Sequence, residues 1–245
     1  MIRALDAEPE PIARKVERVL REAVVTMRLQ PGAMLSEQDV AGRLGVSRQP
    51  VREAFIKLGE VGLLRILPQR GTQVVRISRK GVEDARFIRE AIECAVAREA
   101  ARLADRTVAR RLGDSLARQR RALKTGDGPA LFALDEEFHL ALAEAAGRPA
   151  AWRMVEDIKP QMDRVRFLDM ASAIPMKTVT AQHEVIVEAV RANDPDAAEA
   201  AMRHHLSEIL RSLPKIAAEN PELFEPEPTA PAAPPRAPSP PAAGR

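Results

Sequence analysis

Residues 36–58 constrain the fold most strongly, because they carry the pattern of two short helices joined by a tight turn. Gly45 favours the left-handed backbone conformation that ends a helix. Ser47 is a suitable N-cap for the helix that follows. The apolar positions that recur at helical spacing in the two segments are Val40, Ala41, Leu44, Val51, Phe55 and Leu58. The segment therefore predicts a helix–turn–helix.

The exposed start of the second predicted helix carries Ser47, Arg48, Gln49 and Arg52. A recognition helix presents side chains at this position to base edges in the DNA major groove. Arginine can pair with a guanine edge through two hydrogen bonds, which contributes roughly 1–3 kcal/mol of discrimination. The alternative for both arginines is that they are solvated helix residues.

The flanking segments complete a winged helix domain over residues 1–78. An amphipathic helix is expected over residues 10–28, and Pro31-Gly32 ends it with a turn. Residues 62–77 contain two short β-rich segments around Pro68 to Gly71, which predict a two-stranded wing.

The β pattern disappears from residue 79 onward, and residues 79–218 are expected to form an all-α bundle. The predicted helices cover 80–104, 107–125, 129–146, 149–170, 176–192 and 195–213. Pro129, Pro175 and Pro195 are expected at helix starts. Residues 219–245 are rich in proline and alanine and are expected to be a disordered tail. The fold class is therefore mainly α.

Charge is distributed unevenly along the chain. Residues 1–80 hold 15 Lys/Arg against 9 Asp/Glu, whereas the remainder holds 23 against 26. A basic first third favours a polyanionic partner. The chain has no tyrosine and one tryptophan, which argues against stacking platforms for single-stranded nucleic acid. A single cysteine, no membrane-length apolar run and no signal-peptide pattern favour the cytoplasm.

Three histidines and an aspartate are expected to face the interior of the helical domain. Asp135 and His139 are four residues apart and share one helix face. His183 and His205 occupy core positions of two other helices, whereas His204 points about 100° away from His205.

Imidazole and carboxylate ligands suit a divalent metal, with zinc as the usual occupant and nickel or manganese as alternatives. A single inward histidine is more often a core residue, but three with an aspartate favour a metal site. A rival hypothesis is a metal enzyme fused to a DNA-binding domain. No separate general base supports that hypothesis, and we expect no enzyme.

Arg89 lies on the apolar stripe of its predicted helix and is expected to face inward, where a guanidinium needs a partner. It forms either an internal ion pair, for example with Glu93, or an anchor for an acidic effector. Arg164 and Arg166 are weaker candidates for the same anchor. Cys94 is read as a small core residue rather than a redox sensor.

Two sets of motifs carry a resemblance to a known family. Residues 31–55, followed by Gly62-Leu-Leu and Gln69-Arg-Gly71, resemble the GntR family of bacterial transcription regulators. The helical part resembles the FadR-type ligand-binding domain of that family. Its matching segments are Arg89-x-x-Ile-Glu93, Asp135-x-x-Phe-His139, His183-Glu-x-Ile186 and Met202-x-x-His205-Leu206. The resemblance covers about residues 10–215.

The resemblance implies a cytoplasmic bacterial regulator, expected to be a repressor, that binds double-stranded operator DNA as a homodimer. The positions implied to contact DNA are Gln38, Ser47, Arg48, Gln49, Arg52, Arg70 and Gly71. It also implies a metal held by the Asp/His set beside a small carboxylate effector. The alternative is a DNA-binding protein whose helical domain only dimerises.

Overall fold

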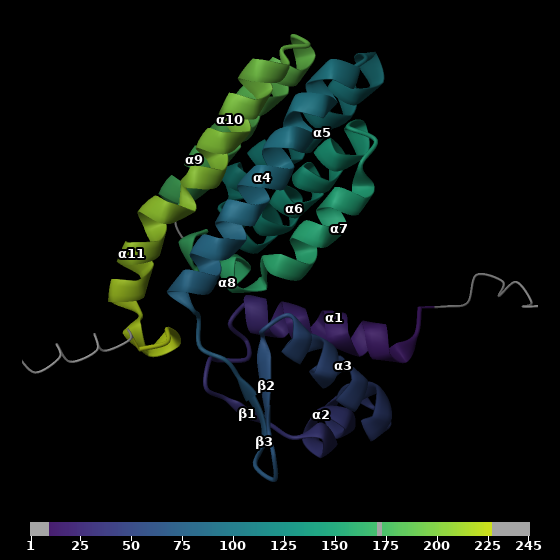
Figure 1. The fold of residues 1–245 in the computed structure, drawn as a ribbon, viewed down its shortest axis with the longest axis vertical. Helices are drawn as coiled ribbons and strands as arrows, with labels where there is room; N and C mark the ends of the chain where they lie inside the picture. Colours follow the sequence, from purple (N-terminus) through teal and green to yellow (C-terminus); the bar gives the residue numbers. More distant parts are fainter. Residues whose placement is uncertain (1–9, 171–172, 227–245) are drawn as a thin grey trace, which may run out of the picture.

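The computed structural model describes residues 10–170 and 173–226. Two parts are stacked along the long axis, with the winged helix at one end and the helical bundle above it (Figure 1). The amphipathic first helix lies between them, directly beneath the bundle. The predicted fold class, mainly α with a small N-terminal sheet, is confirmed.

The winged helix consists of α1 (Ile12–Val25), β1 (Met34–Leu35), α2 (Glu37–Leu44), α3 (Arg48–Glu60), β2 (Leu64–Leu67) and β3 (Gly71–Val74). Gly45 has φ 66° and its N–H binds the Ala41 carbonyl, which ends α2 as predicted. The sheet has three antiparallel strands in the order β1-β3-β2, rather than the two expected. The two-residue β1 is too short to show a period-2 pattern, so no periodicity indicated it.

The helical domain consists of α4 (Arg79–Leu103), α5 (Arg106–Thr125), α6 (Gly128–Ala145), α7 (Pro149–Ile158), α8 (Pro160–Asp169), α9 (Ala173–Arg191), α10 (Pro195–Ser207) and α11 (Ile209–Glu219). Asp127 and Asp194 cap α6 and α10 by accepting backbone N–H groups, with proline in the first turn as predicted. Apolar side chains from α4, α5, α6, α9 and α10 form the main core.

Three predicted helix boundaries were wrong. The segment 149–170 is two helices that meet at Lys159, because Pro160 has no N–H for a continuous helix. The segment 195–213 ends at Ser207, and α11 then runs through Pro214 to Glu219. The helix containing Pro175 begins at residue 173 rather than 176. Proline is tolerated there because the first N–H groups of a helix have no intrahelical partner.

Polar contacts join the two parts where α8 meets the winged helix. The Arg21 guanidinium on α1 donates to the Glu156 carbonyl at 3.1 Å. The Gln161 amide on α8 donates to the Gly62 carbonyl at 2.6 Å, just before β2. Both contacts involve residues next to the break between α7 and α8.

The segment after α11 returns to the linker between the two parts, where the sequence predicted the start of a disordered tail. Pro221–Leu223 form a short 3-10 helix, and Phe224 forms a parallel bridge with Ile77. The Ile77 N–H donates to Leu223 at 2.8 Å, and the Glu225 N–H donates to Ile77 at 2.9 Å. Residues 219–226 are therefore part of the fold, and the rest of the predicted tail, 227–245, lies outside the described residues.

Phe224→Ala should lower the free energy of unfolding by about 3–5 kcal/mol, because the phenyl ring is only 2% exposed in the core under the linker. Urea denaturation of the full chain measures the change. Glu222→Ala is the matched control, since Glu222 is exposed two residues away and should change stability by less than about 0.5 kcal/mol. Equal stability of the two variants would show that the segment does not pack against the linker.

Candidate metal centre and DNA-binding face

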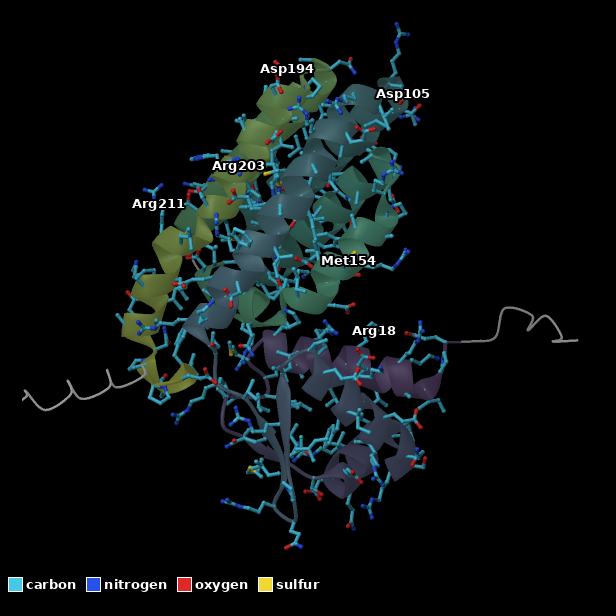
Figure 2. All side chains as sticks on the ribbon, in the orientation of Figure 1. Arg18, Asp105, Met154, Asp194, Arg203 and Arg211 are labelled. Carbon is cyan, nitrogen blue, oxygen red and sulfur yellow. The ribbon has the colours of Figure 1, made fainter. Side chains whose placement is uncertain are left out.

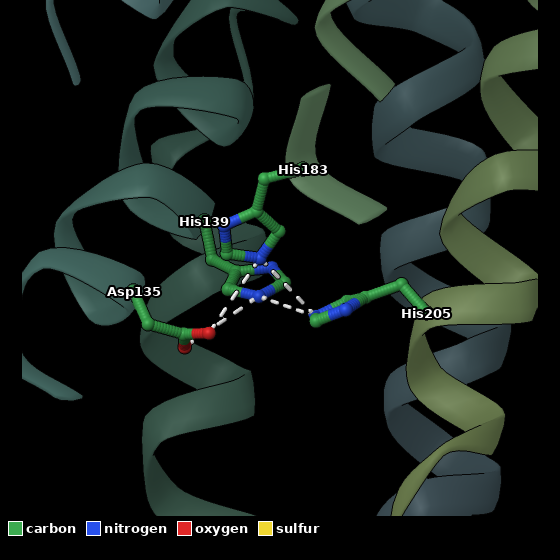
Figure 3. Close-up of side chains that lie close together, drawn as sticks. All are labelled: Asp135, His139, His183 and His205. Carbon is green, nitrogen blue, oxygen red and sulfur yellow. Dashed lines mark hydrogen bonds and ion pairs between the residues drawn. The ribbon is translucent and has the colours of Figure 1, made fainter. Parts of the chain in front are cut away.

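Four buried side chains from three helices meet in the middle of the bundle. Asp135 and His139 come from successive turns of α6, His183 from α9 and His205 from α10 (Figure 3). Their potential ligand atoms all lie within 4.8 Å of one another. Each histidine points its Nε2 inward: His205 Nε2 is 3.2 Å from His139 Nε2 and 3.4 Å from His183 Nε2. Sequence periodicity therefore predicted this cluster correctly.

The other nitrogen of each imidazole ring faces an oxygen of the protein. His139 Nδ1 is 2.5 Å from a Glu93 carboxylate oxygen on α4. His183 Nδ1 is 2.8 Å from Gln119 Oε1 on α5. His205 Nδ1 is 3.0 Å from Gln182 Oε1, and the same amide donates through Nε2 to Glu208. The Gln119 and Gln182 oxygens can only accept, so neutral His183 and His205 carry their proton on Nδ1 and present the Nε2 lone pair to the centre.

Asp135 adds a fourth lone-pair donor to this centre. Its Oδ2 is paired with Arg166, whereas its buried Oδ1 has no hydrogen-bond partner and lies 3.5 Å from His183 Nε2. Lone pairs that face one another without a donor repel, and a cation removes the repulsion. Zinc–nitrogen bonds of 2.0–2.1 Å in a tetrahedron imply nitrogen pairs roughly 3.3 Å apart. The observed Nε2 separations match that value, so the residues fit a metal ion.

The electrostatics keep three of the four candidate ligands, His183, His205 and Asp135, in their metal-binding protonation states. Burial lowers the pKa of His183 to about 3 and holds the pKa of His205 well below its ordinary value. Burial alone would raise the pKa of Asp135, but Arg166 and the neighbouring histidines hold it well below the usual range. Arg89 and His139 likewise outweigh the burial of Glu93 and lower its pKa. Neutral imidazoles and an ionised carboxylate are the forms that bind metals.

A pocket of about 40 Å³ opens beside the centre and is lined by Arg89, Asp135, Met162, Arg166, Asp169, Met170, Val179, His205, Leu206, Glu208 and Ile209. Arg89 pairs with Glu93 through Nε, yet its buried Nη2 has no partner. The internal ion pair and the open donor therefore coexist, and the two sequence interpretations of Arg89 do not exclude each other.

The other two predicted anchor arginines have different surroundings. Arg166 pairs with Asp135, Glu136 and Asp163, so it orients a candidate metal ligand as well as lining the pocket. Arg164 is not among the described pocket-lining residues; its Nη1 donates to Gln161 Oε1 at 3.3 Å near the contact with the winged helix. Helical periodicity could not distinguish the pocket-lining Arg166 from Arg164, because both side chains are buried.

Two further predictions concern His204 and Cys94. His204 is exposed and lies outside the cluster, as expected. Cys94 is 3% exposed in the core, and burial raises the pKa of its thiol to about 11. A buried thiol that keeps its proton is a core residue and a poor redox sensor.

The predicted DNA contacts are all exposed on the winged helix. Gln38, Arg48, Arg70 and Gly71 line one groove between α2, the start of α3 and the turn from β2 to β3. Ser47 is the N-cap residue of α3, and its side chain makes no capping hydrogen bond. Gln49 and Arg52 lie on the first two turns of α3, where Gln49 donates to Glu53 at 2.9 Å.

Comparison with known proteins agrees with both parts. The family described as "Bacterial regulatory proteins, gntR family" matches residues 12–74, and the family described as "FCD domain" matches residues 84–208. The "HTH-type transcriptional repressor RspR" of Escherichia coli (strain K12) is 42% identical over 218 residues, covering 89% of this chain and 96% of that protein. The chain belongs to the GntR family and carries an FCD domain.

Other relatives of this GntR-family regulator extend the comparison. The "Probable D-xylose utilization operon transcriptional repressor" of Paenarthrobacter nicotinovorans is 31% identical, covering 81% of this chain and 87% of that protein. The solved structure titled "E. coli McbR/YncC" has the same fold, with a TM-score of 0.72 over 86% of this chain and 99% of that one at 22% identity. The matched family and the two named repressors are transcription regulators rather than enzymes. Among the helices in residues 10–170 and 173–226, none is long and apolar enough to cross a membrane.

Several site residues escaped the sequence reasoning. Gln119, Gln182 and Glu37 carried no motif signal, although Gln119 and Gln182 contact histidines and Glu37 accepts from Arg48 Nη2 at 3.0 Å. Helical phase gave a partial signal for Gln119, because Leu112, Leu116 and Gln119 fall on one buried face of α5. The partners themselves are far apart in sequence and are decided by packing.

The metal-free regulator should lose stability as the pH falls from about 6.5 toward 4.5. Unfolded histidine takes up a proton near pH 6.5, whereas folded His183 does so only near pH 3 and His205 also resists. The stabilisation is therefore complete above pH 6.5 and declines below it, by about 1.4 kcal/mol per pH unit for each histidine. Urea denaturation of chelator-treated protein at several pH values measures the slope.

His183→Asn should reduce that slope, and exposed His204→Gln should leave it unchanged. The same slope in wild type and His183→Asn would contradict a buried neutral imidazole at position 183.

Proposed function

We propose that this regulator represses transcription in the bacterial cytoplasm by binding operator DNA as a homodimer. A small carboxylate controls DNA binding through a divalent metal ion, for which zinc is the first candidate. The metal ligands are Asp135, His139, His183 and His205. The observation that carries this proposal is the cluster of three buried imidazoles and the Asp135 carboxylate, whose potential ligand atoms lie within 4.8 Å of one another and whose Oδ1 has no hydrogen-bond partner. The repressor names of two relatives support the sign of regulation.

The pocket suits a small anion. A bound metal supplies a Lewis-acidic centre that attracts a carboxylate oxygen. Arg89 has a free buried donor at the same pocket, and guanidinium binds carboxylate through charge-assisted hydrogen bonds. Arg166 lines the pocket too, although its paired nitrogens give it a positioning role toward Asp135. Arg164 is the weakest of the three proposed effector residues, because it lies toward the winged helix.

An ion-pair network supports communication between the pocket and DNA-binding part. Arg166 pairs with three carboxylates, those of Asp135, Glu136 and Asp163. Glu136 and Asp163 also pair with Lys159 at the break between α7 and α8. The contacts from Arg21 to Glu156 and from Gln161 to Gly62 lie within three residues of Lys159. A ligand that changes the pairing of Arg166 thus acts on the helix junction that touches the winged helix.

The exposed face of α4 supports assembly with a second copy. Phe87 is 69% exposed and Ile88 40% exposed, and Ala91 and Ala95 follow on the same side. Large apolar side chains grouped on a surface helix favour burial against another protein surface. A dimer also places two recognition helices on one pseudo-palindromic site. The alternative function, dimerisation without sensing, needs no metal and no pocket.

Purified regulator should contain about one divalent metal per chain. His183→Ala and His205→Ala should lose most of it, because each removes a ligand from the cluster, and melting temperature should fall with the metal. Elemental analysis and thermal denaturation measure both effects. His204→Ala is the matched control one residue from His205, with an exposed ring. Equal metal content in the three variants would overturn the proposed metal centre.

Arg48→Ala should weaken sequence-selective DNA binding by roughly 1–3 kcal/mol, provided that Arg48 reads a base edge. A duplex selected from random sequence by the full chain serves as probe in a gel-shift titration. Arg211→Ala is the control, because Arg211 points into solvent from α11 (Figure 2) and its described ion pair, with partly buried Glu208, is 3.6 Å long. Unchanged affinity of Arg48→Ala would remove this residue from the DNA contacts.

A further inference from the structure

The pocket beside the metal cluster has opposite charge character at its two ends. The deep end holds Arg89, Arg166, Asp135 and His205, all less than 10% exposed. The rim holds two carboxylates, Asp169 and Glu208, both partly exposed. The other lining residues are apolar: Met162, Met170, Val179, Leu206 and Ile209.

The helices set the distance between these ends. Asp169 follows Arg166 by three residues on α8, and Glu208 follows His205 by three residues at the end of α10. Three residues along a helix rise about 4.5 Å. Two independent elements thus place a carboxylate one turn beyond a residue at the deep end. A small ligand that spans the pocket meets both ends.

The deep end is built to receive polar ligand atoms. Arg89 and Asp135 line the pocket, and each has a buried polar atom without a hydrogen-bond partner, Nη2 in Arg89 and Oδ1 in Asp135. Native proteins rarely leave such atoms unpaired, so a bound group is expected to complete them.

The basic neighbours of the two rim carboxylates, Arg211 and Lys215, are not among the residues that line the pocket. Glu208 receives the Gln182 amide at 3.3 Å and lies 3.6 Å from exposed Arg211. Burial raises the pKa of Asp169, and the Glu208 charge raises it further against the opposing effects of Ser212 and Lys215. A second anionic group of a ligand would be repelled here, whereas a hydrogen-bond donor would be stabilised.

We infer that the pocket selects small carboxylates that carry a hydrogen-bond donor, an ammonium or a hydroxyl group, at the end opposite the carboxylate. This inference rests on the proposed function, in which the metal and Arg89 bind the carboxylate. Asp169 and Glu208 then determine specificity by accepting from the donor group. The pocket is small, at about 40 Å³, and we therefore expect a short ligand.

The test uses acids of equal length that differ only at the far end. Propanoate, 3-hydroxypropanoate, β-alanine and malonate form the three-carbon set, and butanoate, 4-hydroxybutanoate, 4-aminobutanoate and succinate form the four-carbon set. Isothermal titration calorimetry on the zinc-loaded full chain gives each affinity. In at least one set, an acid with a donor group should bind about tenfold more tightly than the methyl and dicarboxylate members. Comparison of the hydroxy acid with the amino acid in each set shows which donor group is preferred.

Asp169→Asn combined with Glu208→Gln should reduce that preference to less than about threefold and strengthen dicarboxylate binding, because the substitutions remove charge without changing size. Glu222→Gln is the control, since Glu222 is exposed and outside the pocket. Dicarboxylates that bind wild type as tightly as the donor-bearing acids overturn the inference and leave the proposed function intact. If none of the eight acids binds, the inference is also overturned. The proposed metal centre is tested independently by the metal content of the histidine variants.

Discussion

The helical domain is organised around the buried carboxylate of Asp135. It is fully enclosed, it lies 3.5 Å from His183 Nε2 through Oδ1 and 3.7 Å from His139 Nε2 through Oδ2, and Oδ2 also pairs with Arg166. Burying an ionised group in a bundle is unfavourable unless opposite charge or a metal compensates it. The compensation comes from His139 on the same helix and from three other helices, α8, α9 and α10, so the bundle cannot rearrange locally without leaving charge unpaired.

A shell of hydrogen-bonding side chains fixes the three histidines around this carboxylate. Glu93 on α4, Gln119 on α5 and Gln182 on α9 each face one Nδ1 atom. Ring packing adds to this: Phe138 stacks on His183 with ring centroids 4.0 Å apart, and Trp152 lies parallel to His139 at 5.6 Å. Each ring is thereby restricted in both tautomer and orientation, which is the preorganisation that metal ligands need.

The same charges extend to the contact between the two parts. Glu136 and Asp163 connect Arg166 with Lys159, and the break at Pro160 turns the chain so that Gln161 reaches the Gly62 carbonyl. On the opposite side of the winged helix, Glu37 holds Arg48 at the groove that faces away from the bundle. Ionic contacts therefore occur at the candidate metal centre, at the junction and at the DNA-binding face.

The sequence by itself determined the features that depend on neighbouring residues. Gly45 and the apolar spacing around it specified the helix–turn–helix, and helical phase turned Asp135, His139, His183 and His205 toward one interior. Tertiary structure decided the partners. Arg166 could equally have faced a ligand or a carboxylate, Gln119 lies 64 residues from His183, and Phe224 docks on Ile77 in a segment with the composition of a tail. Helical periodicity arises from hydrogen bonds four residues apart, whereas the partner of a buried charge is set by which distant helices pack around it.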